Sequence, residues 1–157
     1  MSVLANKTAY VVDDDAVHLG MMAFMLRRMG FADVEAFPDA EAALAALEDK
    51  TPDVIISDWN MAPLDGLEFL TLVRSRREWK NIPFVMVTAN TSEHYWRDAI
   101  AAGVTEFLFK PMKFAQLKDA ALVALGLEDS EPHIVKLQKK FDRLAGVRPS
   151  AARAAAH

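Results

Sequence analysis

Four short apolar runs in the sequence are each followed by polar side chains that could do chemistry. Asp13 and Asp14 follow the first of these runs, and Asp58, Thr88 and Lys110 follow the others. Three carboxylates that share one pocket repel one another, so they either raise a pKa or recruit a cation. Oxygen ligands favour a hard divalent ion, and Mg²⁺ suits few protein ligands because it keeps several waters. We therefore expect Mg²⁺ beside the three acids, where Mn²⁺ could substitute.

A metal ion at this position would allow Asp58 to act as a nucleophile toward phosphorus and form an aspartyl phosphate. Phosphoryl transfer depends mainly on positioning and charge neutralisation, for which Lys110 offers a cation and Thr88 a hydroxyl donor. Each residue also has an ordinary role: acidic turns cap helices, as we expect of Asp15, and a lysine after a strand commonly faces solvent. Their joint occurrence after four separate apolar runs favours phosphoryl chemistry.

These side chains can meet only if the segments before them lie side by side with the same orientation. Apolar runs of β character alternate five times with patterns of helical period. The predicted strands are Thr8–Asp13, Asp33–Phe37, Asp53–Asp58, Pro83–Thr88 and Thr105–Phe109, and the predicted helices are Ala16–Met29, Ala40–Glu48, Gly66–Arg77, Ser92–Ala102 and Phe114–Leu125. This alternation predicts an α/β fold, a doubly wound parallel sheet with helices on both faces. The flavodoxin-like (βα)5 strand order 2-1-3-4-5 makes the first and third strands neighbours, which brings Asp13 and Asp14 to Asp58.

Two elements carry more specific expectations. The second strand is the least apolar, so we expect it at the periphery of the sheet. In the first helix, Val17, Met21, Phe24 and Met25 recur at i, i+4, i+7 and i+8. This spacing forms one apolar stripe, which we expect to pack in the core.

Length and composition indicate one domain with an appendage. A chain of 157 residues supports one hydrophobic core, and we expect a domain over residues 1–126 with an extension over residues 127–157. Within the extension, Ile134, Leu137, Phe141 and Leu144 predict an amphipathic helix at about residues 131–145, followed by a frayed end. A helix this short is marginal alone, so it should lie on its own domain, on a second copy or on a partner.

Charge and hydropathy limit the partners. Residues 131–157 carry six Lys or Arg against two acids, a net charge of +4, which leaves −8 on the remaining body. An acidic body argues against a nucleic-acid surface on the main domain. No apolar run is long enough to span a membrane and the N-terminus lacks a signal pattern, so a cytoplasmic protein is expected. The absence of cysteine excludes disulfides and thiolate metal sites.

The same motifs resemble bacterial two-component receiver domains, especially the stand-alone chemotaxis type. The matching segments are VVDDD at 11–15, IISDWNM at 55–61, DG at 65–66, MVTAN at 86–90 and FKPM at 109–112. Together they span nearly all of residues 7–126. The acidic pair, the single Asp, the Thr and the Lys-Pro motif in this order form a highly specific signature.

The resemblance implies roles for the site residues. Asp58 is the expected phosphoacceptor, with Mg²⁺ held by Asp13, Asp14, Asp58 and the backbone carbonyl of Asn60. Thr88 and Lys110 would bind the phosphoryl oxygens, and the bond between Lys110 and Pro111 is expected to be cis. Asn60 and Asn90 occupy the positions that tune hydrolysis of the acyl phosphate.

A conformational switch is implied as well. Phosphorylation should draw Thr88 toward the phosphate and vacate space into which the aromatic ring of Phe107 turns. Phe107 departs from the chemotaxis proteins, which carry Tyr, so it offers no hydroxyl for an output contact. A second departure is Pro63, one residue later than the usual Met-Pro pattern in the loop beside the metal.

The expected partners are proteins. By resemblance, a sensor histidine kinase or phosphotransfer protein would meet the first helix, and a target would bind the fourth helix, fifth strand and fifth helix. The chain after residue 126 is too short for a DNA-binding output domain, so we expect a monomer or weak dimer that signals through protein contact. Two alternatives stay open: a phosphorylation-independent binding module and an aspartate-nucleophile phosphatase. The phosphatase would need an acid where Asn60 stands, so the chain is predicted not to be an enzyme.

Overall fold

One five-stranded parallel sheet organises the chain. The computed structural model describes residues 2–146, and the sheet has the order β2-β1-β3-β4-β5. The strands are β1 Thr8–Val12, β2 Asp33–Phe37, β3 Val54–Asp58, β4 Phe84–Thr88 and β5 Glu106–Phe109. The helices are α1 Ala16–Met29, α2 Ala40–Asp49, α3 Gly66–Ser75, α4 Glu93–Ala102, α5 Phe114–Ala124 and α6 His133–Leu144. The predicted flavodoxin-like fold with an additional C-terminal helix is confirmed.

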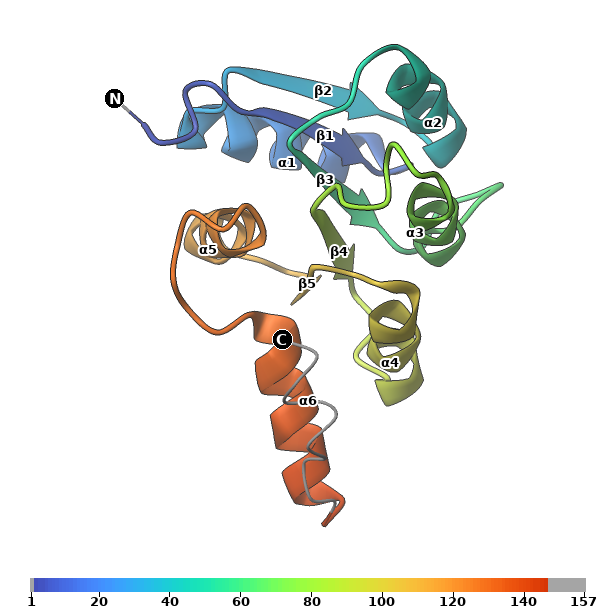
Figure 1. Cartoon of the computed structure of the whole chain (residues 1–157), viewed down its shortest axis with the longest axis vertical. Coiled ribbons are helices and arrows are strands. Elements are labelled where there is room, and N and C mark those ends of the chain that lie inside the picture. The colour runs from blue at the N-terminus through green and yellow to red at the C-terminus, as the bar shows by residue number, and fades with distance from the viewer. Residues whose placement is uncertain (1, 147–157) are drawn as a thin grey trace.

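Helices cover both faces of the sheet and enclose two apolar cores. Figure 1 shows α1 and α5 on one face and α2, α3 and α4 on the other. Because successive strand residues point to opposite faces, Ala9 and Val11 of β1 lie in the core under α1 and α5, whereas Tyr10 and Val12 lie in the other core. β3 and β4 are buried along their whole length. β2 is an edge strand and is largely exposed, in agreement with its weak apolar pattern.

Local sequence signals set the helix ends next to the site. The carboxylate of Asp15 accepts hydrogen bonds from the backbone N–H groups of Val17 and His18, so Asp15 is the predicted N-cap of α1. Asp65 and Glu68 form a capping box at the start of α3. α1 ends at Gly30, whose φ of 105° is a left-handed conformation that favours glycine. The two loops that carry the acids are therefore anchored at defined helix starts.

The prediction that the apolar stripe of α1 packs in the core is wrong, because the stripe mostly faces solvent. Val17 is 76% exposed and Phe24 60% exposed, Met21 also faces solvent, and only Met25 packs partly against the core. The buried face is instead formed by Met22, Ala23, Leu26 and Met29. α1 carries apolar residues around most of its circumference, so the periodicity alone could be placed in more than one phase. This leaves an apolar surface on the solvent side of α1.

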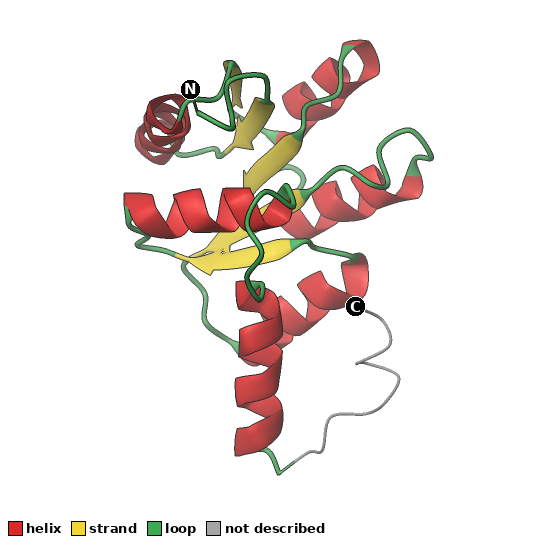
Figure 2. Ribbon diagram, turned by 60° about the vertical axis from the view of Figure 1, so that its left-hand side comes forward, coloured by secondary structure: helices red, strands yellow, loops and turns green. Residues whose placement is uncertain are grey.

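The C-terminal helix α6 packs on its own domain. Ile134 is buried, and Leu137 and Phe141 pack partly against the core on the α2, α3 and α4 face, whereas Leu144 is 78% exposed and takes no part. Figure 2 shows α6 extending away from the sheet. The predicted frayed end at residues 147–157 lies outside the described residues. Within the part of the chain that the structure describes, none of the helices has the length and apolar character needed to cross a membrane.

Gly66 allows α3 to start directly against the strand that ends in Asp58. A Cβ at position 66 would lie 2.4 Å from the backbone oxygen of Asp58 and 2.8 Å from the sulfur of Met86. We expect Gly66→Ala to lower the free energy of unfolding by about 1–3 kcal/mol through overpacking, measured by urea titration. The matched control is Gly20→Ala, at an exposed position in α1 where an added Cβ would have no atom within 4 Å; it should stabilise the protein by about 0.5–1 kcal/mol. Equal effects of the two substitutions would contradict this account.

Candidate functional site

The three acids predicted from the sequence lie together at the carboxyl end of the sheet. β1 and β3 are adjacent, and Val12 pairs with Ser57, so the residues that follow, Asp13 and Asp58, are neighbours. Asp13 is fully buried and Asp58 is 5% exposed, whereas Asp14 is exposed to solvent. One carboxylate oxygen from each of the three lies within 4.8 Å of the other two. This set of hard oxygen donors, open on the side of Asp14, fits a divalent cation such as Mg²⁺.

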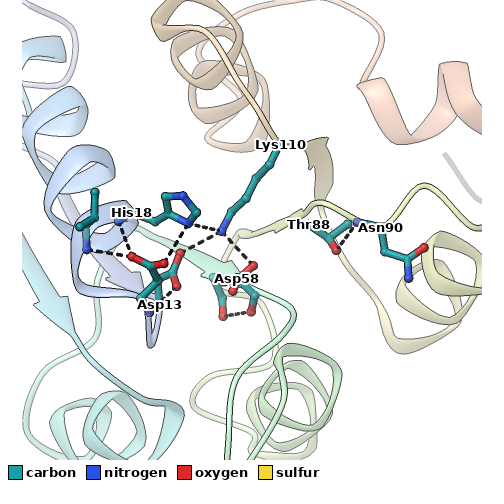
Figure 3. Close-up of polar contacts among 9 residues, drawn as sticks. Asp13, His18, Asp58, Thr88, Asn90 and Lys110 are labelled. Atoms are coloured by element: carbon teal, nitrogen blue, oxygen red, sulfur yellow. Dashed lines mark hydrogen bonds and ion pairs between the residues drawn. The ribbon is translucent and has the colours of Figure 1, made fainter.

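Lys110 brings a positive charge to the same cluster. Its ammonium Nζ lies 3.0 Å from Oδ2 of Asp13 and 3.2 Å from Oδ1 of Asp58 (Figure 3). The backbone N–H of Lys110 donates to the carbonyl oxygen of Thr88, which fixes the end of β5 against β4. The Lys110–Pro111 peptide bond is cis. Lys110 thus bridges the ends of the first and third strands from the fifth.

Burial and charge perturb the titration of both partners. Burial, reinforced by the neighbouring carboxylate of Asp13, raises the pKa of Asp58 above its ordinary value, although Lys110 opposes this shift. Burial acts to lower the pKa of Lys110, but its ion pairs with Asp13 and Asp58 outweigh that effect and raise the pKa. The site therefore holds more negative charge than one lysine compensates, which is the electrostatic condition that attracts a second cation.

Thr88 and Asn90 lie at the end of β4, beside the acidic cluster. Thr88 is fully buried, and its hydroxyl oxygen accepts a hydrogen bond of 3.1 Å from the backbone N–H of Asn90. The Asn90 side-chain oxygen accepts from the backbone N–H of Ser92, just before α4. Among the described contacts, the Thr88 hydroxyl bonds to Asn90 and not to the side chains of Asp58 or Lys110 (Figure 3). The Thr88 hydroxyl keeps its own proton as a donor.

The remaining predicted residues occupy the loop after β3 and the middle of β5. Asn60 is exposed two residues after Asp58. In the same loop the Ala62–Pro63 bond is cis. Phe107 is 1% exposed, and its ring makes an edge contact with Trp59 at 6.3 Å between centroids. The ring at the proposed switch position therefore touches the residue that follows Asp58.

Two polar residues, His18 at the site and Glu106 at the start of β5, were not singled out by the sequence reasoning. His18, in the first turn of α1, places its Nδ1 3.2 Å from Nζ of Lys110. Nothing in the spacing from Asp15 to His18 distinguishes this histidine from a surface residue. Glu106 is fully buried inside the apolar strand β5. A buried acid needs partners, so an acid within an otherwise apolar run is a signal of a buried polar contact.

Comparisons of the sequence with family models and with known proteins point to the same family. A family model described as "Response regulator receiver domain" matches residues 9–122. The chain is 30% identical over 146 residues to a protein from Vibrio cholerae serotype O1 named chemotaxis protein CheY-3, an alignment that covers 92% of this chain and 100% of the relative. It is 34% identical over 120 residues to chemotaxis protein CheY1 of Helicobacter pylori, covering 76% and 97% of the two chains.

Solved structures agree with these sequence matches. The structure of chemotaxis protein CheY4 of Vibrio cholerae, crystallised at low pH, superposes with a TM-score of 0.72 at 32% identity. The superposition covers 76% of this chain and 99% of that one. The similarity thus extends over the whole sheet and its flanking helices.

Proposed function

The chain belongs to the response regulator receiver domain family, and from this premise we propose that it is a phosphoacceptor of a two-component phosphorelay that switches a protein–protein contact. The observation that carries the proposal is the convergence of Asp13, Asp58 and Lys110 at one edge of the sheet. Relatives named as chemotaxis proteins favour a motility-type or relay pathway. A role beside a sensor kinase would place the chain in the cytoplasm.

In the proposed reaction a carboxylate oxygen of Asp58 attacks phosphorus, and the bond from phosphorus to the donor's leaving group breaks. The side chains of Asp13, Asp14 and Asp58, with the backbone carbonyl of Asn60, would hold Mg²⁺, and Mn²⁺ could substitute. When bound, the ion supplies positive charge to the phosphoryl oxygens. Lys110, which lies between Asp13 and Asp58, would pair with another phosphoryl oxygen and so help to neutralise the transferred group.

The residues around the phosphoryl group would then change conformation in response to it. The Thr88 hydroxyl can donate to the third oxygen, and its movement toward the phosphate would open space beside Phe107. Asn60 and Asn90 flank the acyl phosphate and would tune its hydrolysis. Phe107 lacks the hydroxyl of related proteins, so this switch would act through packing of the ring rather than through a new hydrogen bond.

The solvent-facing apolar side chains of α1 fit a contact with the phosphodonor. Val17, Met21 and Phe24 are exposed on the helix that begins at the acidic loop. Isolated exposed apolar residues are common, but three on one helix surface beside a reactive carboxylate form a patch suited to a protein partner. A histidine kinase or phosphotransfer protein docked here could reach Asp58, and the target would bind α4, β5 and α5.

Incubation of the protein with acetyl phosphate tests the proposal against its alternatives. With Mg²⁺ we expect intact mass spectrometry to show the gain of one phosphoryl group, and with EDTA we expect no gain. Continuous release of phosphate from a phosphate ester would instead identify a phosphatase, which Asn60 disfavours because it supplies no general acid. Neither phosphoryl gain nor ester turnover would identify a phosphorylation-independent binding module.

A further inference from the structure

Helix α6 lies on the surface through which the proposed target would bind. The ring of Phe141 in α6 makes an edge contact with Trp96 of α4 at 5.6 Å between centroids. The guanidinium of Arg97, also in α4, lies 4.2 Å from the centre of the same ring. On the other side, His133 approaches Asp119 of α5 at 3.8 Å. Figures 1 and 2 both show α6 at the β5 end of the sheet beside α4. α6 therefore contacts all three elements of the proposed target surface.

A buried carboxylate from β5 fixes the start of α6. One oxygen of Glu106 accepts from the backbone N–H of His133 at 2.8 Å, and the other accepts from the backbone N–H of Ile134 at 2.8 Å. His133 Nδ1 lies 3.2 Å from the first of these oxygens. The residue before α6 is Pro132, which provides no side-chain cap. Glu106 thus satisfies helix donors that the local sequence leaves free, and its negative charge suits the helix N-terminus.

The same carboxylate connects α6 to the proposed switch residue. The oxygen of Glu106 that accepts from Ile134 also accepts from the backbone N–H of Phe107 at 3.0 Å. The side chains of Phe107, Trp59 and Ile134 belong to one buried cluster. A shift of Phe107 would therefore disturb both the polar and the apolar contacts at the start of α6.

Other contacts of α6 are shallow. Apart from Ile134 and Asp142, its side chains are half-buried or exposed. A cleft of about 340 Å³ stays open between α6 and the end of β5, lined by residues that include Phe109, His133 and Leu137. Protein cores are normally close-packed, so this interface is less well filled than the two cores of the sheet. A 12-residue helix is also marginal when it is not docked.

We propose that α6 is a reversible cover of a helix-binding surface on α4, β5 and α5, and that phosphorylation of Asp58 weakens its docking. The proposal rests on the proposed function, because it names what occupies the target surface before phosphorylation. In the unphosphorylated chain α6 fills the place of a target helix. Movement of Phe107 on phosphorylation weakens the packing of Ile134 and the hydrogen bond from Ile134 to Glu106. A target helix can then replace α6.

Hydrogen exchange of the full chain tests this coupling. Beryllofluoride with Mg²⁺ serves as a reversible phosphoryl analogue at Asp58. We expect its addition to speed exchange of the backbone amides of residues 133–144 at least about tenfold, which corresponds to about 1.4 kcal/mol of lost docking. The amides of β3 should stay protected, and Asp58→Asn should show no change. Unchanged exchange in α6 with beryllofluoride bound would overturn the proposal that phosphorylation weakens the docking of α6. Phosphoryl gain from acetyl phosphate would still support the receiver function in that case.

A pair of substitutions tests the same coupling from the other end. Phe141→Ala removes the contact with Trp96, so it should speed exchange of α6 without any phosphoryl analogue. Because coupling between two equilibria is reciprocal, it should also tighten beryllofluoride binding several-fold. Leu144→Ala is the control, since Leu144 is exposed in the same helix and should change neither quantity. Looser α6 with unchanged beryllofluoride affinity would overturn the coupling, and absence of phosphorylation by acetyl phosphate would overturn both proposals.

Discussion

Replacement of Asp58 by asparagine should abolish phosphorylation of the protein by acetyl phosphate. The amide group of Asn lacks the carboxylate oxygen that forms the acyl phosphate. Intact mass spectrometry after incubation with acetyl phosphate and Mg²⁺ should find only the unmodified chain. A control is Asp65→Asn, the same substitution at the N-cap of α3. Asn also caps helices well, so this variant should fold and accept a phosphoryl group as the wild type does.

Loss of phosphorylation in Asp58→Asn should not reflect loss of the fold. Burial and Asp13 raise the pKa of Asp58 in the folded state, so its ionisation at neutral pH costs stability. A raised folded-state pKa means that stability is full below the unfolded pKa of about 3.9 and falls as pH rises through the folded value. In a urea titration in EDTA at pH 7, the variant should therefore show an equal or higher free energy of unfolding than the wild type, and this gain should vanish in acid. A phosphoryl group on the variant, or its unfolding at pH 7, would contradict the assignment.

The sheet and the acidic site were predictable because they depend on local patterns that repeat. Five apolar runs separated by helical patterns allow few topologies, and only the order in which the first and third strands are adjacent brings Asp13 to Asp58. Burial of β3 and β4 on both faces follows from their continuous apolar composition. The position of Lys110 then follows from the end of β5. For these elements the sequence signals and the tertiary packing agree.

Other features depended on contacts that no local pattern records. The solvent side of α1 is apolar at Val17 and Phe24, so the period of apolar residues alone did not show which face of the helix is buried. The start of α6 is capped by Glu106, 27 residues earlier in the chain. His18 contacts Lys110 because the Lys110 side chain extends from the end of β5 to Asp13, just before α1. Such long-range polar contacts become visible only when the packing of whole elements is known.

Replacement of Lys110 by methionine should destabilise the metal-free protein by about 2–4 kcal/mol, as expected when one partner of a buried ion pair is removed. Its ammonium is the cation 3.0 Å from Asp13 and 3.2 Å from Asp58, and its side chain is only 15% exposed. Methionine keeps much of the length and removes the charge, so two nearly buried carboxylates face each other without compensation. Urea unfolding in EDTA at pH 7 measures the effect. Protonation of Asp58 relieves it, so the deficit should shrink as the pH is lowered toward 4.

Magnesium distinguishes this electrostatic effect from a loss of packing. Lys110 and the metal compete for the carboxylates of Asp13 and Asp58, so the methionine variant should bind Mg²⁺ more tightly than the wild type. At ten times the dissociation constant, Mg²⁺ should restore about 1.4 kcal/mol. Phosphorylation by acetyl phosphate should nevertheless slow by a factor of about 10²–10³, because a charged donor to the transition state is missing.

The matched control is Lys118→Met, at an exposed position on α5. This variant should change the free energy of unfolding by less than about 0.5 kcal/mol. A deficit in Lys110→Met that neither acid nor Mg²⁺ relieves would place the role of Lys110 in packing and not in charge.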